Sequence, residues 1–302
     1  MPSAEHEALV ASHASERETE RPASVEETVA GFEAMAGYFE ALEFPAEVQQ
    51  EPADPGGVPG VWFTPPDARP DRAVLYLHGG GYMVGSVATH RSLIARIARA
   101  SGVRCLAIDY RLAPLHPFPA AVEDACTAYR WLLAQGLGAA RLVLAGDSAG
   151  GGLALGSLVA LRDAGDPLPA AGVCLSPLTD LEVSGDSARG GADDPMVTRD
   201  GVAMMAEAYL QGADARDPRA SPLHADFAGF PPLLIQVGTR EVLLDDATRV
   251  AARARAAGVR VTLEKGEGLT HVWQLYPHLP EAIDSVDRIG RYVASHLGGV
   301  IS

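Results

Sequence analysis

The sequence predicts an α/β fold with one mainly parallel central sheet flanked by helices. From about Gly57 onward, short apolar runs alternate with helix-sized amphipathic segments, as a doubly wound sheet requires. The runs are apolar at nearly every position, which is typical of strands covered on both faces. The chain has 302 residues, 47% of them hydrophobic, which is enough apolar material for one large core. We therefore expect one α/β domain over residues 46–302.

The elements of this domain follow from hydrophobic periodicity. The strand candidates are Ala73–Leu77, Val103–Ile108, Leu142–Ala145, Ala171–Leu175, Leu233–Val237 and Val259–Leu263. Helical patterns occupy Ser92–Ala100, Ala121–Gln135, Gly151–Asp163 and Asp246–Ala257. Residues 181–219 break this rhythm, being rich in Gly, Asp and Arg around a shorter helical segment near Val202–Leu210. We expect an insertion there that carries part of a small helical lid.

Residues 1–45 are predicted to form an N-terminal helical lid segment ahead of the sheet. Ser24-Val25-Glu26-Glu27 has the form of a capping box. Apolar residues recur behind it at helical spacing, namely Val25, Val29, Phe32, Ala36 and Phe39. The pattern is equally consistent with a helix that only pads the core, so the sequence alone does not choose between the two roles.

Composition and charge exclude several classes of partner. The formal net charge of −15 repels nucleic-acid backbones and anionic lipid, so we expect a small neutral substrate, with no nucleic acid and no membrane insertion. The three cysteines are odd in number and form no CxxC pair, which predicts free buried thiols rather than disulfides or a zinc site. Residues 1–20 show no secretory pattern, so a cytoplasmic location is the default. An exposed sheet edge would offer a route to a homodimer.

The strongest local signal is Gly146-Asp147-Ser148-Ala149-Gly150, which fits the pattern G-x-S-x-G. It directly follows a strand candidate and precedes a helical pattern that starts with small residues. In that context a sharp strand-to-helix turn strains the serine backbone, and the flanking glycines keep the turn free of clashes. A serine that merely caps the helix is the alternative. The context favours Ser148 as the nucleophile of an α/β-hydrolase.

A second signal, His78-Gly79-Gly80-Gly81, follows the strand candidate Ala73–Leu77. Acyl transfer builds negative charge on the carbonyl oxygen of the substrate, and backbone N–H groups without side chains in the way can approach that oxygen closely. α/β-Hydrolases place such donors in this loop and at the residue after the nucleophile. A phosphate cradle is the alternative, but the loop lacks both G-K-[ST] and G-x-G-x-x-G. We predict an oxyanion hole made of Gly79, Gly80, Gly81 and Ala149.

A serine nucleophile needs a general base, and in this fold the order along the chain is serine, acid, histidine. Beyond the strand candidate Leu233–Val237 the chain contains His271, His278 and His296. His271 lies in a glycine-containing loop after the last strand candidate, where a side chain can reach over the edge of the sheet. His278 is flanked by prolines and His296 belongs to the terminal helix. We therefore predict that His271 is the base.

The acid is expected on the turn after Leu233–Val237, and Glu241 is the carboxylate there. Its role would be to hold the imidazole of the base in the right tautomer and to stabilise the imidazolium. Asp245 and Asp246 lie one turn further on and are also suited to starting the next helix. Glu241 is our choice, with Asp245 as the main alternative.

With these residues in place, the sequence resembles the hormone-sensitive lipase-like esterases, also called the bacterial family IV carboxylesterases. The resemblance spans about Val61 to His271. It rests on motifs in the family's order: His78-Gly79-Gly80-Gly81, Asp109-Tyr110-Arg111-Leu112-Ala113-Pro114, His116-Pro117-Phe118-Pro119-Ala120, Gly146-Asp147-Ser148-Ala149-Gly150-Gly151 and the segment from Gly238 to Asp246.

The resemblance implies an α/β-hydrolase fold with a lid built from N-terminal helices and an insertion. It implies hydrolysis of short- to medium-chain acyl esters through a Ser-His-Glu triad and a covalent acyl-enzyme, without metal or cofactor. It also implies that Gly80, Gly81 and Ala149 are the closest oxyanion donors. Two positions depart from the family pattern. The acid position reads Glu241-Val242 where aspartate and proline are usual, and Leu115 stands where glutamate is more common.

Three other functions require residues that can be checked in the sequence. A β-lactamase-like acylase needs a lysine three residues after its nucleophile, but Gly151 is there and Lys265 is the only lysine of the chain. A hormone-binding member of the same family lacks a working histidine, whereas His271 is present. An amidase or lactone hydrolase could use the same triad, and the triad does not exclude them.

Overall fold

The structure is a computed structural model that describes residues 2–19, 24–189 and 194–298. Its centre is one eight-stranded sheet in the order β1-β2-β4-β3-β5-β6-β7-β8. The pairs β1–β2 and β2–β4 are antiparallel, and the remaining neighbours in this sheet are parallel. The strands are β1 (Gln49–Ala53), β2 (Gly60–Thr64), β3 (Ala73–Leu77), β4 (Cys105–Ile108), β5 (Leu142–Asp147), β6 (Ala171–Leu175), β7 (Leu233–Gly238) and β8 (Val261–Gly266).

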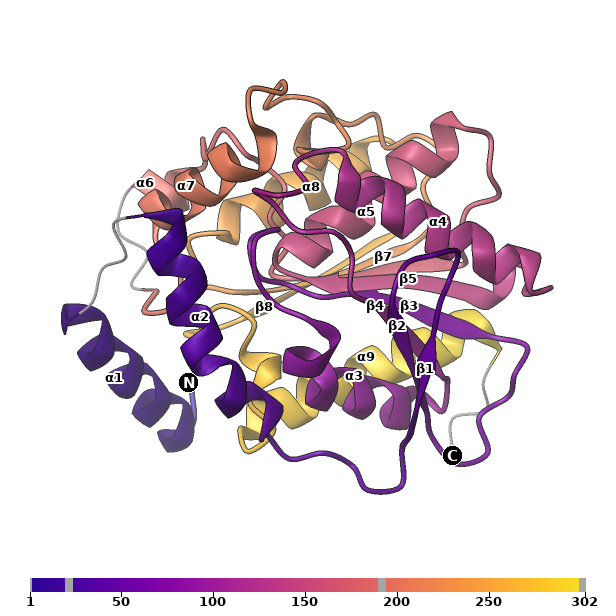
Figure 1. Ribbon diagram of the computed structural model, residues 1–302, viewed down its shortest axis with the longest axis horizontal. Helices are drawn as coiled ribbons and strands as arrows, with labels where there is room; N and C mark the ends of the chain where they lie inside the picture. The colour runs from indigo at the N-terminus through magenta and orange to yellow at the C-terminus, as the bar shows by residue number, and fades with distance from the viewer. Residues whose placement is uncertain (1, 20–23, 190–193, 299–302) are drawn as a thin grey trace.

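Helices cover both faces of the sheet, as Figure 1 shows. One face carries α3 (Val87–Ser101) and α9 (Pro280–Leu297), and the other carries α4 (Ala120–Ala134), α5 (Ala149–Asp163) and α8 (Leu244–Ala256). Four further helices are α1 (Ala4–Thr19), α2 (Val25–Glu40), α6 (Asp186–Arg189) and α7 (Arg199–Leu210). Short 3₁₀ turns are η1 (Ala139–Arg141), η2 (Pro222–His224) and η3 (Trp273–Leu275).

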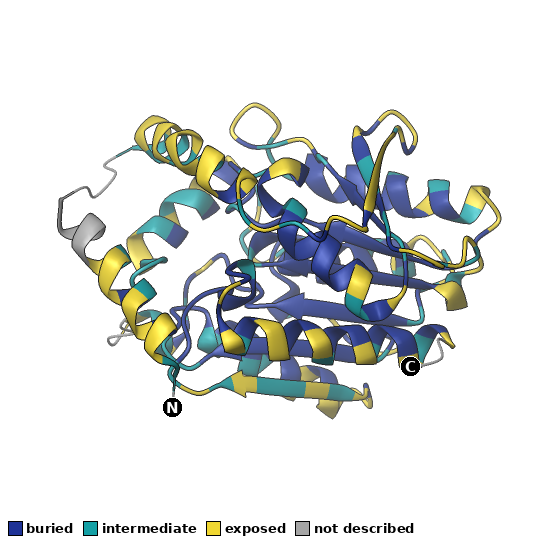
Figure 2. Cartoon of the chain, turned by 90° about the horizontal axis from the view of Figure 1, so that it is seen from below, coloured by how far each residue is buried: buried dark blue, intermediate teal, exposed yellow. Residues whose placement is uncertain are grey.

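Strand β3 explains why the sheet needs a helix layer on each side. Leu75 and Leu77 pack into the core shared with α4, α5 and α8, whereas Val74 and Tyr76 pack into the core shared with α3 and α9. All four side chains are fully buried, and Figure 2 shows the same dark interior along the central strands. Because alternate residues face opposite layers, the whole strand reads as apolar.

A third, smaller core joins the N-terminal helices to the segment that leads into α9. Its buried members are Phe39, Leu269, Trp273, Tyr276, Leu279 and Ala282. Leu9 of α1, Leu42 and Met196 pack against them. The N-terminal segment is therefore attached to the end of the molecule where β8 leads into η3 and α9.

Most predicted elements are confirmed, and the mainly parallel sheet with them. β3 and β6 have the expected bounds, and β8 begins two residues later than expected. Helix α2 begins as predicted, with the Ser24 side chain accepting the N–H of Glu27 at 3.2 Å. The three cysteines are free and buried, as expected. Among the described helices, none combines the length and the apolar character needed to cross a bilayer.

Two features were not predicted from the sequence. Helix α1 lies within the predicted helical segment 1–45 but ahead of the one helical pattern found there, and the β1–β2 hairpin lies before the first strand candidate. Strand β1 carries no apolar alternation because four of its five residues are exposed. Strands β1 and β8 form the two edges of the sheet, and a homodimer formed through an edge stays a prediction.

We predict that Gly290→Ala destabilises the contact between α9 and α3. A Cβ atom at Gly290 would lie 2.5 Å from the backbone carbonyl of Ala100, so the two helices would have to separate. Overpacking of this kind costs about 1–3 kcal/mol of the free energy of unfolding, which urea denaturation measures. Gly31→Ala in α2 is the matched control because a Cβ there meets no atom within 4 Å. Equal effects of the two substitutions would contradict the prediction.

Candidate active site

The backbone of Ser148 is strained at the junction of β5 and α5. Its φ of 52° lies in a region that non-glycine residues rarely adopt. The conformation is held by backbone hydrogen bonds, because Ser148 N donates to Leu175 O at 2.8 Å and Ser148 O accepts the N–H groups of Gly152 and Leu178 at 3.0 Å. The side chain makes no capping bond to α5. Ser148 therefore does not cap helix α5 with its side chain, which was the alternative interpretation.

The glycines around Ser148 are needed because three backbone segments meet there. A Cβ atom on Gly150 would lie 2.1 Å from the carbonyl oxygen of Leu77, and one on Gly146 would lie 2.4 Å from the carbonyl oxygen of Gly150. No side chain fits at either position. The G-x-S-x-G spacing therefore reflects the close approach of β3, β5 and α5.

Glu241 and His271 come together from separate loops. Glu241 follows β7 and His271 follows β8, and the Nδ1 atom of His271 lies 3.0 Å from the Oε2 atom of Glu241. Glu241 is fully buried and His271 is 8% exposed. Within the described chain, the Ser148 hydroxyl and the Nε2 atom of His271 form no hydrogen bond, and the hydrogen bond of the His271 ring is the one to Glu241.

Ser176 connects the two loops, and no sequence pattern had singled it out. Its hydroxyl donates to Glu241 Oε1 at 2.6 Å and accepts the N–H of Val272 at 3.2 Å. Ser176 is fully buried and has a φ of 45°. It directly follows β6, and the carboxyl ends of parallel strands are where sites form in such sheets. That position was the signal that could have identified it.

The electrostatics of the pair follow from burial and hydrogen bonding. Burial alone would lower the pKa of His271, but the hydrogen bond and the negative charge of Glu241 outweigh it and raise that pKa above the ordinary 6.5. Burial raises the pKa of the Glu241 carboxyl, and the hydrogen bonds from His271 and Ser176 oppose this. His271 is therefore a stronger base than a free imidazole.

The other carboxylates and histidines considered for these roles have different partners. Asp245 accepts the N–H of Ser187 at 2.9 Å and so ties α6 to α8. Asp246 accepts two backbone N–H groups, and burial raises its pKa to about 7. His278 is exposed, and the Nδ1 atom of His296 contacts the carbonyl oxygen of Tyr292 in α9.

The glycine loop after β3 contributes free backbone amides. The N–H of Gly79 donates to Asp147 Oδ1 at 3.2 Å. Within the described chain, the N–H groups of Gly80, Gly81 and Ala149 form no hydrogen bond. A Cβ atom on Gly80 would lie 2.1 Å from the carbonyl oxygen of Val84, so the loop can follow this path only with glycine there. The amides available to a ligand are thus those of Gly80, Gly81 and Ala149.

Asp147 fastens the glycine loop to the turn at Ser148. Its buried carboxylate accepts the hydroxyl of Tyr76 at 2.7 Å and the N–H of Gly79, and it lies 3.3 Å from Nε2 of His90. Burial acts against charge on both partners, yet their mutual attraction raises the pKa of His90 and lowers that of Asp147. Each partner therefore favours the charged form of the other. Next to it, burial lowers the pKa of His78 to about 3.

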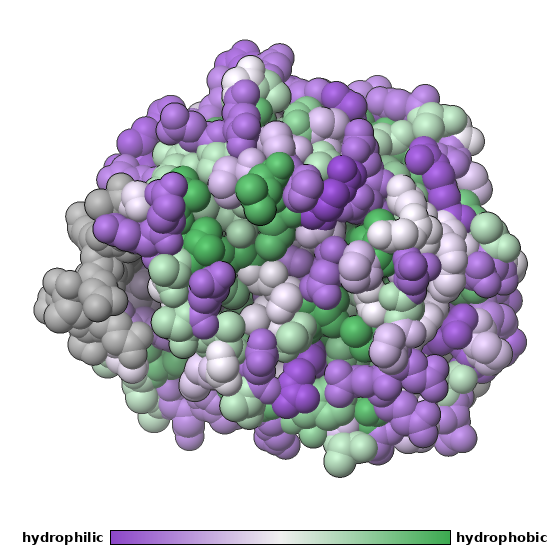
Figure 3. Space-filling view, viewed as in Figure 1, coloured by the Kyte–Doolittle hydropathy of each residue, from purple (hydrophilic) through white to green (hydrophobic). Residues whose placement is uncertain are grey.

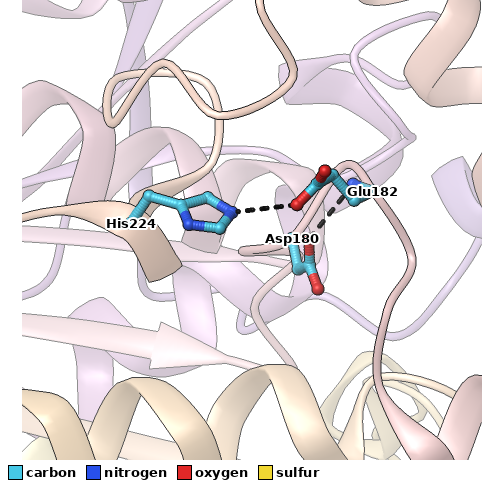
Figure 4. Close-up of side chains that lie close together, drawn as sticks. All are labelled: Asp180, Glu182 and His224. Carbon is cyan, nitrogen blue, oxygen red and sulfur yellow. Dashed lines mark hydrogen bonds and ion pairs between the residues drawn. The ribbon is translucent and has the colours of Figure 1, made fainter.

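One cluster outside this site has the composition of a metal site. Asp180, Glu182 and His224 place one ligand atom each within 4.8 Å of one another, as drawn in Figure 4. Both carboxylates already have cationic partners, because Asp180 pairs with Arg249 at 3.0 Å and Glu182 with Arg216 at 2.9 Å. A metal ion would have to displace these arginines, so the cluster is explained as a network of ion pairs.

The comparisons with known proteins agree with this geometry. Residues 74–275 match the family described as alpha/beta hydrolase fold. An acetyl-hydrolase of Streptomyces hygroscopicus is 50% identical over 241 residues, which cover 78% of this chain and 80% of that protein. The crystal structure of an esterase from the bacterial hormone-sensitive lipase family has a TM-score of 0.92 and 46% identity, covering 99% of this chain and 100% of that chain.

A further crystal structure, that of EstE5 soaked by p-nitrophenyl butyrate, has a TM-score of 0.90 and 42% identity. It covers 98% of this chain and 100% of its own. A strained serine turn at the carboxyl edge of a parallel sheet, facing a glycine loop, defines an α/β hydrolase. The chain belongs to the bacterial hormone-sensitive lipase family of this class, as the resemblance predicted.

We predict that Asp147→Ala strongly destabilises the fold. The substitution leaves His90 without its buried counter-charge and removes the acceptor of Tyr76 and Gly79. Breaking a buried ion pair from one side costs about 3–5 kcal/mol of the free energy of unfolding. Asp163→Ala is the control, since Asp163 forms an exposed pair with Arg162 and such pairs contribute about 0–1 kcal/mol. Similar urea midpoints for the two variants would show that the contacts of Asp147 do not contribute this much to the free energy of unfolding.

Proposed function

We propose that this chain hydrolyses short- to medium-chain acyl esters through Ser148, His271 and Glu241, with a covalent acyl-enzyme. The chain is a carboxylic-ester hydrolase, as its family and relatives indicate. The observation that carries the finer proposal is the 3.0 Å contact between His271 and Glu241, which follow β8 and β7 at the carboxyl edge of the same sheet in which β5 leads to Ser148. The relatives support short acyl groups, because one is an acetyl-hydrolase and another was soaked by a butyrate ester.

In the first half-reaction, Ser148 Oγ attacks the carbonyl carbon of the ester. His271 Nε2 takes the hydroxyl proton as Nδ1 keeps its hydrogen bond to Glu241, which stabilises the resulting imidazolium. The N–H groups of Gly80, Gly81 and Ala149 receive the developing oxyanion. When the tetrahedral intermediate collapses, the C–O bond to the alcohol breaks and His271 returns the proton to the departing oxygen.

In the second half-reaction, a water molecule attacks the acyl-enzyme. His271 takes a proton from this water, the tetrahedral intermediate forms in the same oxyanion hole, and Ser148 leaves with the proton that His271 returns. The products are the carboxylic acid and the free enzyme. The positions of Ser148 and His271 are compatible with these reaction steps, because the hydrogen bond between a catalytic serine and its histidine commonly shortens only when substrate is bound.

Helices α2 and α7 support the role of a small lid over this site. Met205 of α7 lies against the oxyanion loop, where a Cβ atom on Gly81 would come within 2.2 Å of its Sδ atom. Tyr209 of α7 stacks on Tyr82, which follows the glycines, with ring centroids 3.8 Å apart. Figure 3 shows apolar side chains gathered on the surface near α2 and α7, which Figure 1 labels in the same view. An acyl chain entering beneath them would meet an apolar wall.

We predict that Ser148→Ala abolishes hydrolysis and that Glu241→Ala is far more harmful than Asp245→Ala. Loss of the nucleophile in comparable triads costs on the order of 10⁶ in kcat, and loss of the acid about 10⁴. Initial rates on p-nitrophenyl esters from acetate to palmitate measure both effects, with Asp245→Ala as the matched carboxylate control. Retained activity of Ser148→Ala would refute the assignment. Amide but not ester hydrolysis by the wild type would point to an amidase.

We predict that kcat/KM falls on the acid side with an apparent pKa above the 6.5 of a free histidine. The base must be neutral, and Glu241 favours its protonated form, so activity is present above the raised pKa of His271 and lost as the pH falls through it. In Glu241→Gln the acid limb should move to lower pH because burial then dominates. Rates of p-nitrophenyl acetate hydrolysis over about pH 5–9 test this; an acid limb that does not move in Glu241→Gln would contradict the role of Glu241.

A further inference from the structure

In the loop that carries His271, the backbone N–H groups of the residues directly before and after it donate to side chains and not to a neighbouring strand. After His271, the N–H of Val272 donates to Ser176 Oγ at 3.2 Å. Before it, the N–H of Thr270 donates to the Nε2 atom of His6 at 3.3 Å, and the Thr270 hydroxyl lies 3.2 Å from the same nitrogen. His6 belongs to helix α1, so the N-terminal segment reaches the residue next to the proposed base.

Other contacts fasten the first turns of α1 around this point. Ser3 N and Ser3 Oγ donate to the carboxylate of Glu281 at the start of α9, and Ser3 Oγ accepts the N–H of His6 at 3.1 Å. Glu7 of α1 lies 3.5 Å from Arg240, which directly precedes Glu241. His6 itself is fully buried. Helix α1 is therefore attached to both loops of the carboxylate–histidine pair.

The bond from Thr270 determines the protonation state of His6. A backbone N–H can only donate, so Nε2 of His6 must keep its lone pair and the ring is neutral with its proton on Nδ1. Within the described chain, Nδ1 has no hydrogen-bond partner. A second proton would set an N–H of His6 against the N–H of Thr270, and the bond would break. The bond from the Thr270 N–H therefore requires an unprotonated Nε2 of His6, whereas a protonated Nε2 could donate to the Thr270 hydroxyl instead.

The charged groups around His6 shift its pKa in both directions. Burial lowers the pKa of His6 below the ordinary 6.5, and the positive charge of Arg240 after β7 lowers it further. The negative charges of Glu281 in α9 and Glu7 in α1 act in the opposite direction and raise this pKa. A released α1 would expose His6 to water at its ordinary pKa. The free energy that docks α1 is therefore fully present above about pH 6.5 and decreases as the pH falls below that value.

We propose that His6 is a positioning residue for the hydrolysis: by accepting the N–H of Thr270 it aligns the His271 loop, and protonation of His6 releases that alignment. The proposal rests on the assignment of His271 as the base. It goes beyond that assignment because it makes the N-terminal helix part of the machinery that orients the imidazole. The role is conformational, since His6 contacts neither the reacting serine nor Glu241 in the described structure.

Two substitutions at His6 separate the acceptor from the bulk of the ring. His6→Leu fills the space without an acceptor, whereas in His6→Gln the Oε1 atom stands close to the position of Nε2 and accepts at every pH. We expect His6→Leu to lower kcat for p-nitrophenyl acetate at pH 8 by about tenfold with KM little changed, because a misplacement of about 1 Å costs up to 10²-fold. We expect His6→Gln to retain most of kcat.

The pH profile gives a second readout that a merely structural role would not move. In the wild type, log kcat/KM should fall with a slope steeper than one proton at the acid end of the profile, since His6, whose pKa burial lowers, takes up a proton there in addition to His271. In His6→Gln the limb should keep the slope of one proton. His296→Leu is the matched histidine control, because His296 lies near the end of α9 with Tyr292 as its partner, and it should behave as the wild type.

Three outcomes would overturn the proposal. The first is an unchanged kcat in a folded His6→Leu, the second is equal loss in His6→Leu and His6→Gln, and the third is a wild-type acid slope in His6→Gln. The last comparison works even if His6→Leu does not fold. Failure of the proposed function is recognised separately, because His271→Ala would then remain active. An inactive His271→Ala together with any of the three outcomes rejects the role of His6 alone.

Discussion

The turn at Ser148 is the constraint on which the rest of the site depends. A positive φ at a serine costs on the order of 1–3 kcal/mol, and the surrounding backbone holds it with bonds from Leu175, Leu178 and Gly152. The turn leaves no room for side chains at Gly146 and Gly150, since each Cβ would collide with a carbonyl oxygen. Strand β3 thus approaches the turn at backbone contact distance. Because β3 leads into the glycine loop, the proposed nucleophile Ser148 and the amides of the proposed oxyanion hole are built as one unit.

Two buried carboxylates flank this unit, each adjacent to a histidine. Asp147 lies beneath the turn and pairs with His90, whereas Glu241 pairs with His271 at the edge of the sheet. A buried carboxylate is tolerated only with several donors, and each has hydrogen-bond donors from different elements. The difference lies in the free end of the imidazole. Both ring nitrogens of His90 have partners, so that pair stiffens the loop, whereas Nε2 of His271 forms no hydrogen bond with any described residue, as the proposed base requires.

The predictable parts were those encoded locally. Strand β3 is apolar throughout because both its faces are covered, and the turn at Ser148 has a fixed spacing of small residues, so both were expected at the right positions. Strand β1 was not, because its exposed residues show no alternation. Glu241 was preferred to Asp245 as the acid although both follow β7, and the two differ in their partners, since Glu241 contacts His271 and Asp245 accepts the N–H of Ser187 in α6. Contacts such as His6–Thr270 join residues 264 positions apart and have no sequence pattern.

His271 and His6, which contacts the residue before it, have pKa values shifted in opposite directions. Glu241 raises the pKa of His271, while burial lowers that of His6. As the pH falls, His271, the proposed base, therefore takes up its proton first, and His6 still accepts the N–H of Thr270 while it does so. Helix α1 stays docked over the whole range in which His271 is neutral. The Ser176 hydroxyl, which holds the other side of the loop, does not titrate in this range. The alignment of the imidazole is consequently complete wherever the imidazole can act as a base.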